Sequence, residues 1–126
     1  MREIKFRAWD PISKKMIIPK EFIQLDKLYI GYFDESGYPK ISEDFILMQY
    51  IGVNDKNKKE IYEGDVIVQK HGEIKGVVRF RDGVFGVDTG KAFYPFPAYK
   101  DIEVIGNIYE NSELLKEVIK WNVMNI

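Results

Sequence analysis

The chain contains no cysteine and a single histidine, His71. The absence of cysteine excludes disulfide bonds, thiolate catalysis and zinc sites built on thiolates. One histidine also excludes a histidine-rich metal site. We therefore expect neither a metal site nor a cofactor.

The sequence also lacks long apolar runs, and none approaches the roughly 20 residues that a membrane-spanning helix needs. Its start, Met1–Lys5, carries charges where a signal peptide would have its apolar core. We therefore expect a soluble, cytoplasmic protein that has no membrane partner.

No charge sign dominates, because 19 basic residues oppose 20 acidic ones and the net charge is −1. This balance argues against a protein whose main task is to hold a nucleic acid backbone. The charges are nevertheless unevenly distributed, since residues 1–20 and 66–100 are basic and residues 21–50 are acidic. The stretches are interpreted as solvated faces, and the alternative is complementary patches that meet within or between subunits.

Alternating apolar and polar residues, broken by turn residues, predict short β-strands over most of the chain. The run Arg81-Asp82-Gly83 predicts a tight hairpin turn, because Asp-Gly supplies the dihedral angles that such turns require. Several short strands after Gly64 predict a small curled antiparallel sheet or an SH3-like barrel. We expect an N-terminal β subdomain, residues 1–55, and a barrel-like subdomain, residues 56–126, or one compact domain containing both.

One helix is predicted near residues 112–122, after the last strand. Asn111 and Ser112 are good N-cap residues. Leu114, Leu115, Val118 and Ile119 then form an apolar stripe at helical spacing. A short helix needs tertiary support, so we expect this stripe to pack on the sheet, with a dimer contact as the alternative.

Three sequence blocks occur in the order typical of one known family: Arg2–Asp10, Leu47–Val66 and Glu103–Asn111. With these blocks the chain resembles the YopX family, whose members are proteins of phages and prophages in low-GC Gram-positive bacteria. The resemblance implies a mostly β fold and an origin in a phage or prophage. It transfers no catalytic residues.

A search for catalytic groups returns little. His71 lies beside Gly72 in a predicted hairpin turn, where a structural or solvated role is favoured over catalysis. In the segment Glu63-Gly64-Asp65, Gly64 is expected to adopt a left-handed or otherwise open conformation, and Asp65 is expected to accept hydrogen bonds from nearby backbone amides. The residues of this segment are better explained by the requirements of a turn that starts a strand than by a role in a binding loop. We therefore predict that the protein is not an enzyme.

The best candidate binding surface is the aromatic and proline-rich segment Phe93–Tyr99, which we expect to be an irregular loop held extended by two prolines. Its aromatic side chains could stack on bases or receive a peptide. Alternatively, they fold back and seal the end of the barrel. The candidate binding residues are Lys91, Phe93, Tyr94, Phe96, Tyr99 and Lys100.

The function expected from these features is that of a phage or prophage accessory protein. We expect a non-catalytic module that binds an unknown protein partner or assembles with itself as a homo-oligomer. The alternative hypothesis is an SH3-like barrel that binds nucleic acid.

Overall fold

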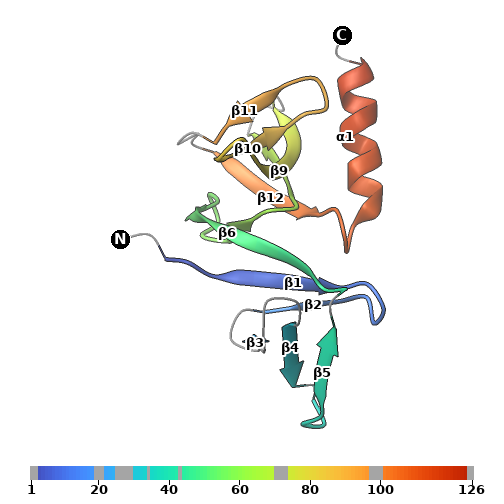
Figure 1. Cartoon of the computed structure of the whole chain (residues 1–126). Helices are drawn as coiled ribbons and strands as arrows, with labels where there is room; N and C mark the ends of the chain where they lie inside the picture. Colours follow the sequence, from blue (N-terminus) through green and yellow to red (C-terminus); the bar gives the residue numbers. More distant parts are fainter. Residues whose placement is uncertain are drawn as a thin grey trace. The chain divides into compact units, whose positions relative to one another are not determined.

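The computed structural model describes residues 3–18, 22–24, 30–33, 35–42, 44–69, 74–96 and 101–124. Over these residues the chain forms twelve strands and one C-terminal helix, which confirms the predicted mainly β fold (Figure 1). The chain divides into two units, one of residues 4–49 and the other chiefly of residues 50–126.

The unit of residues 4–49 contains two antiparallel sheets. The hairpin β1–β2 pairs through β1 with the start of β6, and β4 lies between β3 and β5. The strands are β1 (Phe6–Asp10), β2 (Lys15–Ile17), β3 (Phe22–Gln24), β4 (Ile30–Phe33), β5 (Pro39–Ser42) and β6 (Ile46–Asn54). Ala8 and Ile17 are opposite each other in the register and are fully buried.

The turn between β1 and β2 is organised by the buried carboxylate of Asp10. It accepts the Ser13 hydroxyl at 2.6 Å and the Ile12 backbone N–H at 3.0 Å. Burial raises the pKa of the Asp10 carboxyl, but these hydrogen bonds and the charge of Lys40 outweigh burial and lower the pKa below its ordinary value.

The unit of residues 50–126 is built on a curled antiparallel sheet with the strand order β11-β10-β9-β8-β12 (Figure 1). The remainder of β6 pairs with β7 in the same unit. The further strands are β7 (Glu60–Tyr62), β8 (Asp65–Gln69), β9 (Lys75–Arg81), β10 (Val84–Asp88), β11 (Phe93–Pro95) and β12 (Ile102–Asn107). The buried apolar core under the sheet consists of Ile51, Ile61, Ile67, Val78, Val87, Ile102 and Val104.

The predicted turn at Arg81-Asp82-Gly83 is confirmed. Asp82 and Gly83 have φ angles of 53° and 81°, and Arg81 pairs directly with Val84. Positive φ at both central residues is the geometry of a type I′ turn, whose twist matches that of the flanking strands. This turn fixes the register of β9 against β10.

Two aspartates of the block Leu47–Val66 organise the turns around β7. The Asp55 carboxylate accepts backbone N–H groups from Asn57, Lys59 and Val104 at 2.8, 2.9 and 3.0 Å. Burial raises the pKa of the Asp55 carboxyl, but these bonds and the charge of Lys59 outweigh burial and lower it.

The predicted geometry of the second turn is confirmed as well. Gly64 has a φ of 86°, and the buried Asp65 carboxylate accepts the Tyr62 N–H at 2.8 Å. Both aspartates are therefore engaged in holding backbone, which is a structural role.

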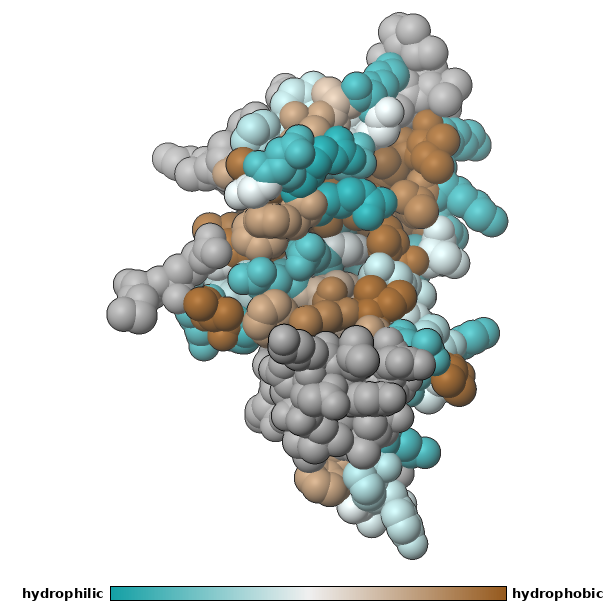
Figure 2. All heavy atoms as spheres, viewed as in Figure 1, coloured by the Kyte–Doolittle hydropathy of each residue, from teal (hydrophilic) through white to brown (hydrophobic). Residues whose placement is uncertain are grey.

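Helix α1 (Ser112–Met124) begins at the predicted position and packs on the sheet. Of the predicted apolar stripe, Leu114, Leu115 and Val118 pack there, whereas Ile119 is 56% exposed, so the expectation was wrong for that residue. Val118 is buried with Val66 of β8 and Val77 of β9, and Lys75 forms an ion pair with Glu117 at 3.5 Å. In Figure 2 the side of the helix toward the sheet is brown and its outer edge is teal, as expected of an amphipathic helix. Among the described residues, no helix is both long enough and apolar enough to cross a bilayer.

The side chain of Asn111, the residue before the helix, does not have the expected capping role. Its Oδ1 atom turns back and accepts the Asn107 N–H at 3.2 Å, while its backbone carbonyl accepts the Leu114 N–H at 2.8 Å. Asn111 thus ties the end of β12 to the start of the helix.

Candidate functional site

The first part of the predicted aromatic loop is a β-strand, so the expectation of an irregular loop at Phe93–Pro95 was wrong. These residues form β11, with Tyr94 opposite Val87 and Phe93 opposite Asp88. The Phe96 N–H donates to the Phe85 carbonyl at 2.7 Å, and the Thr89 N–H donates to the Ala92 carbonyl at 3.0 Å.

Pro95 is compatible with this strand because of its position in the hydrogen-bonding pattern of the ladder. Those two bonds show that even-numbered residues of this segment bond to β10, so the N–H that Pro95 lacks would have pointed away from the ladder. Tyr99 and Lys100, the other two candidates of the segment, lie outside the described residues.

The remaining candidate residues do not share one surface. Successive side chains of a strand point to opposite faces of the sheet, so Phe93 faces one side and Tyr94 faces the other. Phe96 lies on the side of Tyr94 and is partly buried against the core. The structure therefore divides the predicted binding set between two faces.

On the core side of the sheet, aromatic side chains extend the candidate surface into β9 and β10. Phe80 is directly opposite Phe85, their ring centroids are 4.8 Å apart, and the rings meet edge to face. Phe80 is 53% exposed and Tyr94 is 41% exposed. We name this set, Phe80, Phe85, Tyr94 and Phe96, the aromatic row.

Phe80 and Phe85 were missed from the sequence, although a signal for them was present. The two-residue turn Asp82-Gly83 places Arg81 opposite Val84, and one step further along the hairpin it places Phe80 opposite Phe85. A register drawn from the predicted turn would have shown that the two rings meet.

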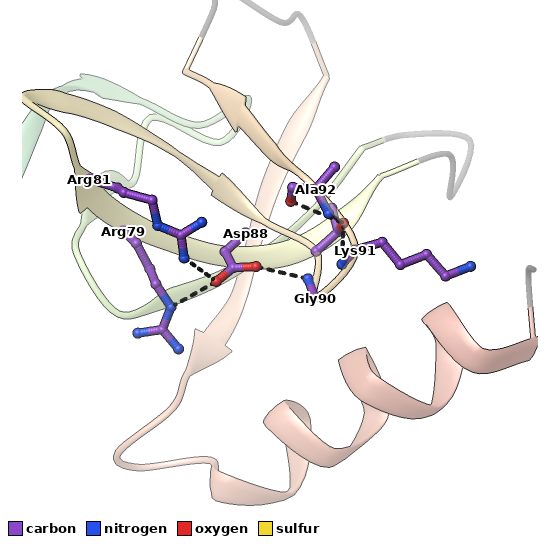
Figure 3. A network of polar contacts seen from close by, with 7 residues as sticks. Arg79, Arg81, Asp88, Gly90, Lys91 and Ala92 are labelled. Atoms are coloured by element: carbon purple, nitrogen blue, oxygen red, sulfur yellow. Dashed lines mark hydrogen bonds and ion pairs between the residues drawn. The ribbon is translucent and has the colours of Figure 1, made fainter.

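The opposite face of the same strands, on which α1 also packs, carries a polar network (Figure 3). The Oδ2 atom of Asp88 accepts Arg81 Nη2 at 2.9 Å and lies 3.4 Å from Arg79 Nε. Its Oδ1 atom accepts the Gly90 N–H at 2.8 Å. Lys91, a predicted binding residue, follows in the hairpin loop, and its side chain extends away from the network in Figure 3.

Phe93 joins this network through Arg81, whose guanidinium carbon lies 4.8 Å from the centre of the Phe93 ring. A Cβ atom at Gly86 would lie 2.4 Å from Phe93 Cζ and 2.6 Å from the Tyr94 carbonyl oxygen. The missing side chain of Gly86 is therefore what lets the ring lie across β10. We name Arg79, Arg81, Asp88 and Phe93 the arginine face.

In the part of the chain that the structure describes, no three His, Asp or Glu side chains are grouped so that they could hold a metal ion. His71 lies outside the described residues. The candidate site thus consists of the aromatic row on one face of the sheet and the arginine face on the other.

The domain is a mainly β domain. Its curled antiparallel sheet is covered by a C-terminal helix, and buried aspartates hold its turns. The chain belongs to the YopX family, because the model of that family, described as YopX protein, matches residues 5–116.

Two crystal structures are similar to the chain. Protein EF1440 from Enterococcus faecalis is 28% identical with a TM-score of 0.60, and the match covers 91% of this chain and 99% of that one. Protein yopX from Bacillus subtilis is 25% identical with a TM-score of 0.57, at the same two coverages. No curated protein matches the chain.

Proposed function

We propose that this protein is a non-catalytic accessory protein of a phage or prophage, and that it binds another protein through the aromatic row. One observation carries the proposal: Phe80 and Tyr94 are 53% and 41% exposed on the same side of one sheet, next to the partly buried Phe85 and Phe96. Clustered exposed aromatic side chains mark contact sites, because large rigid rings contribute much of the binding energy of protein interfaces.

The edge of β11 suits an extended segment of such a partner. Since the even-numbered residues bond to β10, the N–H and C=O groups of Phe93 point outward from the sheet. Among the described residues no strand pairs with that side of β11. A partner strand placed there would gain main-chain hydrogen bonds at Phe93 and an apolar contact at Tyr94. Pro95 offers no N–H, which limits this edge to a short pairing.

The proposed phage or prophage origin and the proposed non-catalytic role are supported by separate observations. Membership in the YopX family supports a phage or prophage origin, since the family resemblance implies it. The carboxylates of Asp55 and Asp65 hold backbone amides, which supports a structural role for the sequence block that contains them.

The test is co-purification from phage-infected cells with a variant that removes both exposed rings, Phe80→Ala together with Tyr94→Ala. We expect each ring to contribute on the order of 1–3 kcal/mol to partner binding. The matched control is Ile119→Ala, which removes a 56% exposed apolar side chain from the same unit. If the folded double variant retained its partner as well as the control does, the aromatic row would not be the contact site.

The second candidate function, nucleic acid binding, is favoured by one observation: Arg81 is stacked on Phe93 beside Arg79. It predicts strongly salt-dependent shifts of single- or double-stranded DNA or RNA in a gel. If such shifts were observed and were lost in an Arg79→Gln, Arg81→Gln variant, nucleic acid binding would replace protein binding as the proposed function. Light scattering in the same experiment tests whether the partner is a second copy of the chain.

A further inference from the structure

We propose that the arginine face is a carboxylate-recognition site that takes an acidic side chain of a bound peptide. This inference concerns the face opposite the aromatic row and does not depend on the row being a contact site. It rests on the donor groups of Arg79 and Arg81, on the support of Arg81 by Phe93, and on the charge of the cluster.

The two guanidinium groups have more hydrogen-bond donors than their internal partner can accept. Each guanidinium carries five N–H donors. Arg79 uses Nε and Arg81 uses Nη2 toward the same oxygen, Asp88 Oδ2. The two arginine side chains are 40% and 47% exposed, so a ligand can reach part of each guanidinium.

Arg81 is held in place before any ligand arrives. Its guanidinium lies over the Phe93 ring at 4.8 Å, and the ring lies over Gly86. A preorganised guanidinium loses less side-chain freedom when it binds, and therefore more of the binding energy is retained.

The chemistry of the cluster favours a carboxylate over a nucleic acid backbone. Two arginines and one aspartate give the arginine face a net charge of +1, and the chain as a whole has a net charge of −1. A polyanion gains most of its affinity from many phosphate contacts, which this charge does not provide. The guanidinium pair already engages one carboxylate, and planar guanidinium groups match carboxylates in bidentate geometry.

In this arrangement Asp88 competes with the carboxylate of a ligand for the two arginines. Variants of Asp88 and of the arginines should therefore change the affinity in opposite directions. Asp88→Asn removes the competing charge and keeps an oxygen for the Gly90 N–H. It should strengthen binding of a short glutamate-rich peptide about threefold. Arg79→Gln together with Arg81→Gln should weaken it about tenfold. The control is Lys56→Gln, because Lys56 forms a comparably exposed ion pair with Glu103 at 3.5 Å. It should change the affinity less than about twofold.

The measurement is an NMR titration that follows the Arg79 and Arg81 Nε–H signals and the Gly90 amide, with a glutamine-rich peptide of equal length as the uncharged probe. Inorganic phosphate and a single-stranded oligonucleotide are titrated in parallel. Saturable shifts with the glutamate-rich peptide alone support the proposal. It is overturned if Asp88→Asn weakens binding, if the double arginine variant binds as the wild type does, or if phosphate or the oligonucleotide binds more tightly. The Phe80→Ala, Tyr94→Ala variant leaves the arginine face intact. A negative result in the titration therefore does not count against the aromatic row, and a negative result in the co-purification does not count against the arginine face.

Discussion

Replacing Asp55 by alanine should destabilise the unit of residues 50–126 more than any surface substitution near it. The Asp55 side chain joins the loop between β6 and β7 to β12, because its two oxygens accept N–H groups of Asn57, Lys59 and Val104. The residue is only 8% exposed, so water does not readily replace the lost acceptor.

The expected loss of unfolding free energy follows from the three hydrogen bonds of Asp55. A hydrogen bond to a charged acceptor contributes about 1.5–3 kcal/mol, and a buried donor left unsatisfied costs about 1–3 kcal/mol. After Asp55→Ala, the N–H groups of Asn57 and Lys59 lie in an exposed turn that water can reach, whereas that of Val104 lies in a buried strand. We therefore expect a loss of about 3–4 kcal/mol of unfolding free energy. Asp55→Asn retains one acceptor oxygen and should cost about 1–3 kcal/mol.

Urea denaturation followed by circular dichroism measures these losses, and amide hydrogen exchange at Val104 locates them. The control is Lys56→Gln, which breaks the exposed ion pair with Glu103 and should cost less than about 1 kcal/mol. An Asp55→Ala variant as stable as this control, with Val104 still protected from exchange, would show that the carboxylate does not hold the loop to β12.

Three further outcomes are expected. The folded-state pKa values of Asp10 and Asp55 are lowered, so their ionised forms stabilise the protein above the unfolded-state pKa of about 3.9. This stabilisation should be lost as the pH falls through the folded-state values, and Asp55→Asn should show a smaller loss in denaturation curves recorded between about pH 2 and pH 6. Gly86→Ala should destabilise by about 1–3 kcal/mol, because a Cβ would lie 2.6 Å from the Tyr94 carbonyl oxygen, and NMR should show Arg81 Nε–H shifted from its wild-type position. Val118→Ala should cost about 2 kcal/mol in urea denaturation, while Ile119→Ala, at an exposed position, should cost less than about 0.5 kcal/mol.

Features decided by neighbouring residues could be predicted from the sequence. The turn at Asp82-Gly83 follows from local dihedral preferences, and the helix that begins at Ser112 follows from its apolar stripe. The conformation of Gly64 and the acceptor role of Asp65 were predictable for the same reason. None of these needs knowledge of a distant strand.

Features decided by strand pairing could not be predicted from neighbouring residues alone. Because proline cannot donate to a ladder, the sequence predicts a loop at Phe93–Pro95. Only the register with β10 shows that Pro95 falls at a position where no donor is required. Likewise, Arg79 and Arg81 meet Asp88 across a hairpin, where sequence spacing gives no signal until the register is fixed.

The sequence blocks that identify the family and the surfaces that could bind a partner are different parts of this chain. The blocks Leu47–Val66 and Glu103–Asn111 contain the buried aspartates, the open glycine and the Asn107 and Asn111 contacts that hold turns and strand ends. Both candidate surfaces come instead from residues 79–96, which include parts of β9, β10 and β11 and the residue directly after β11, Phe96. Because a strand presents alternate side chains to its two faces, changes at even-numbered positions of β9 and β11 alter the aromatic row, and changes at odd-numbered positions alter the arginine face. The same sheet therefore carries two chemically different surfaces that can vary independently, and family membership alone specifies neither.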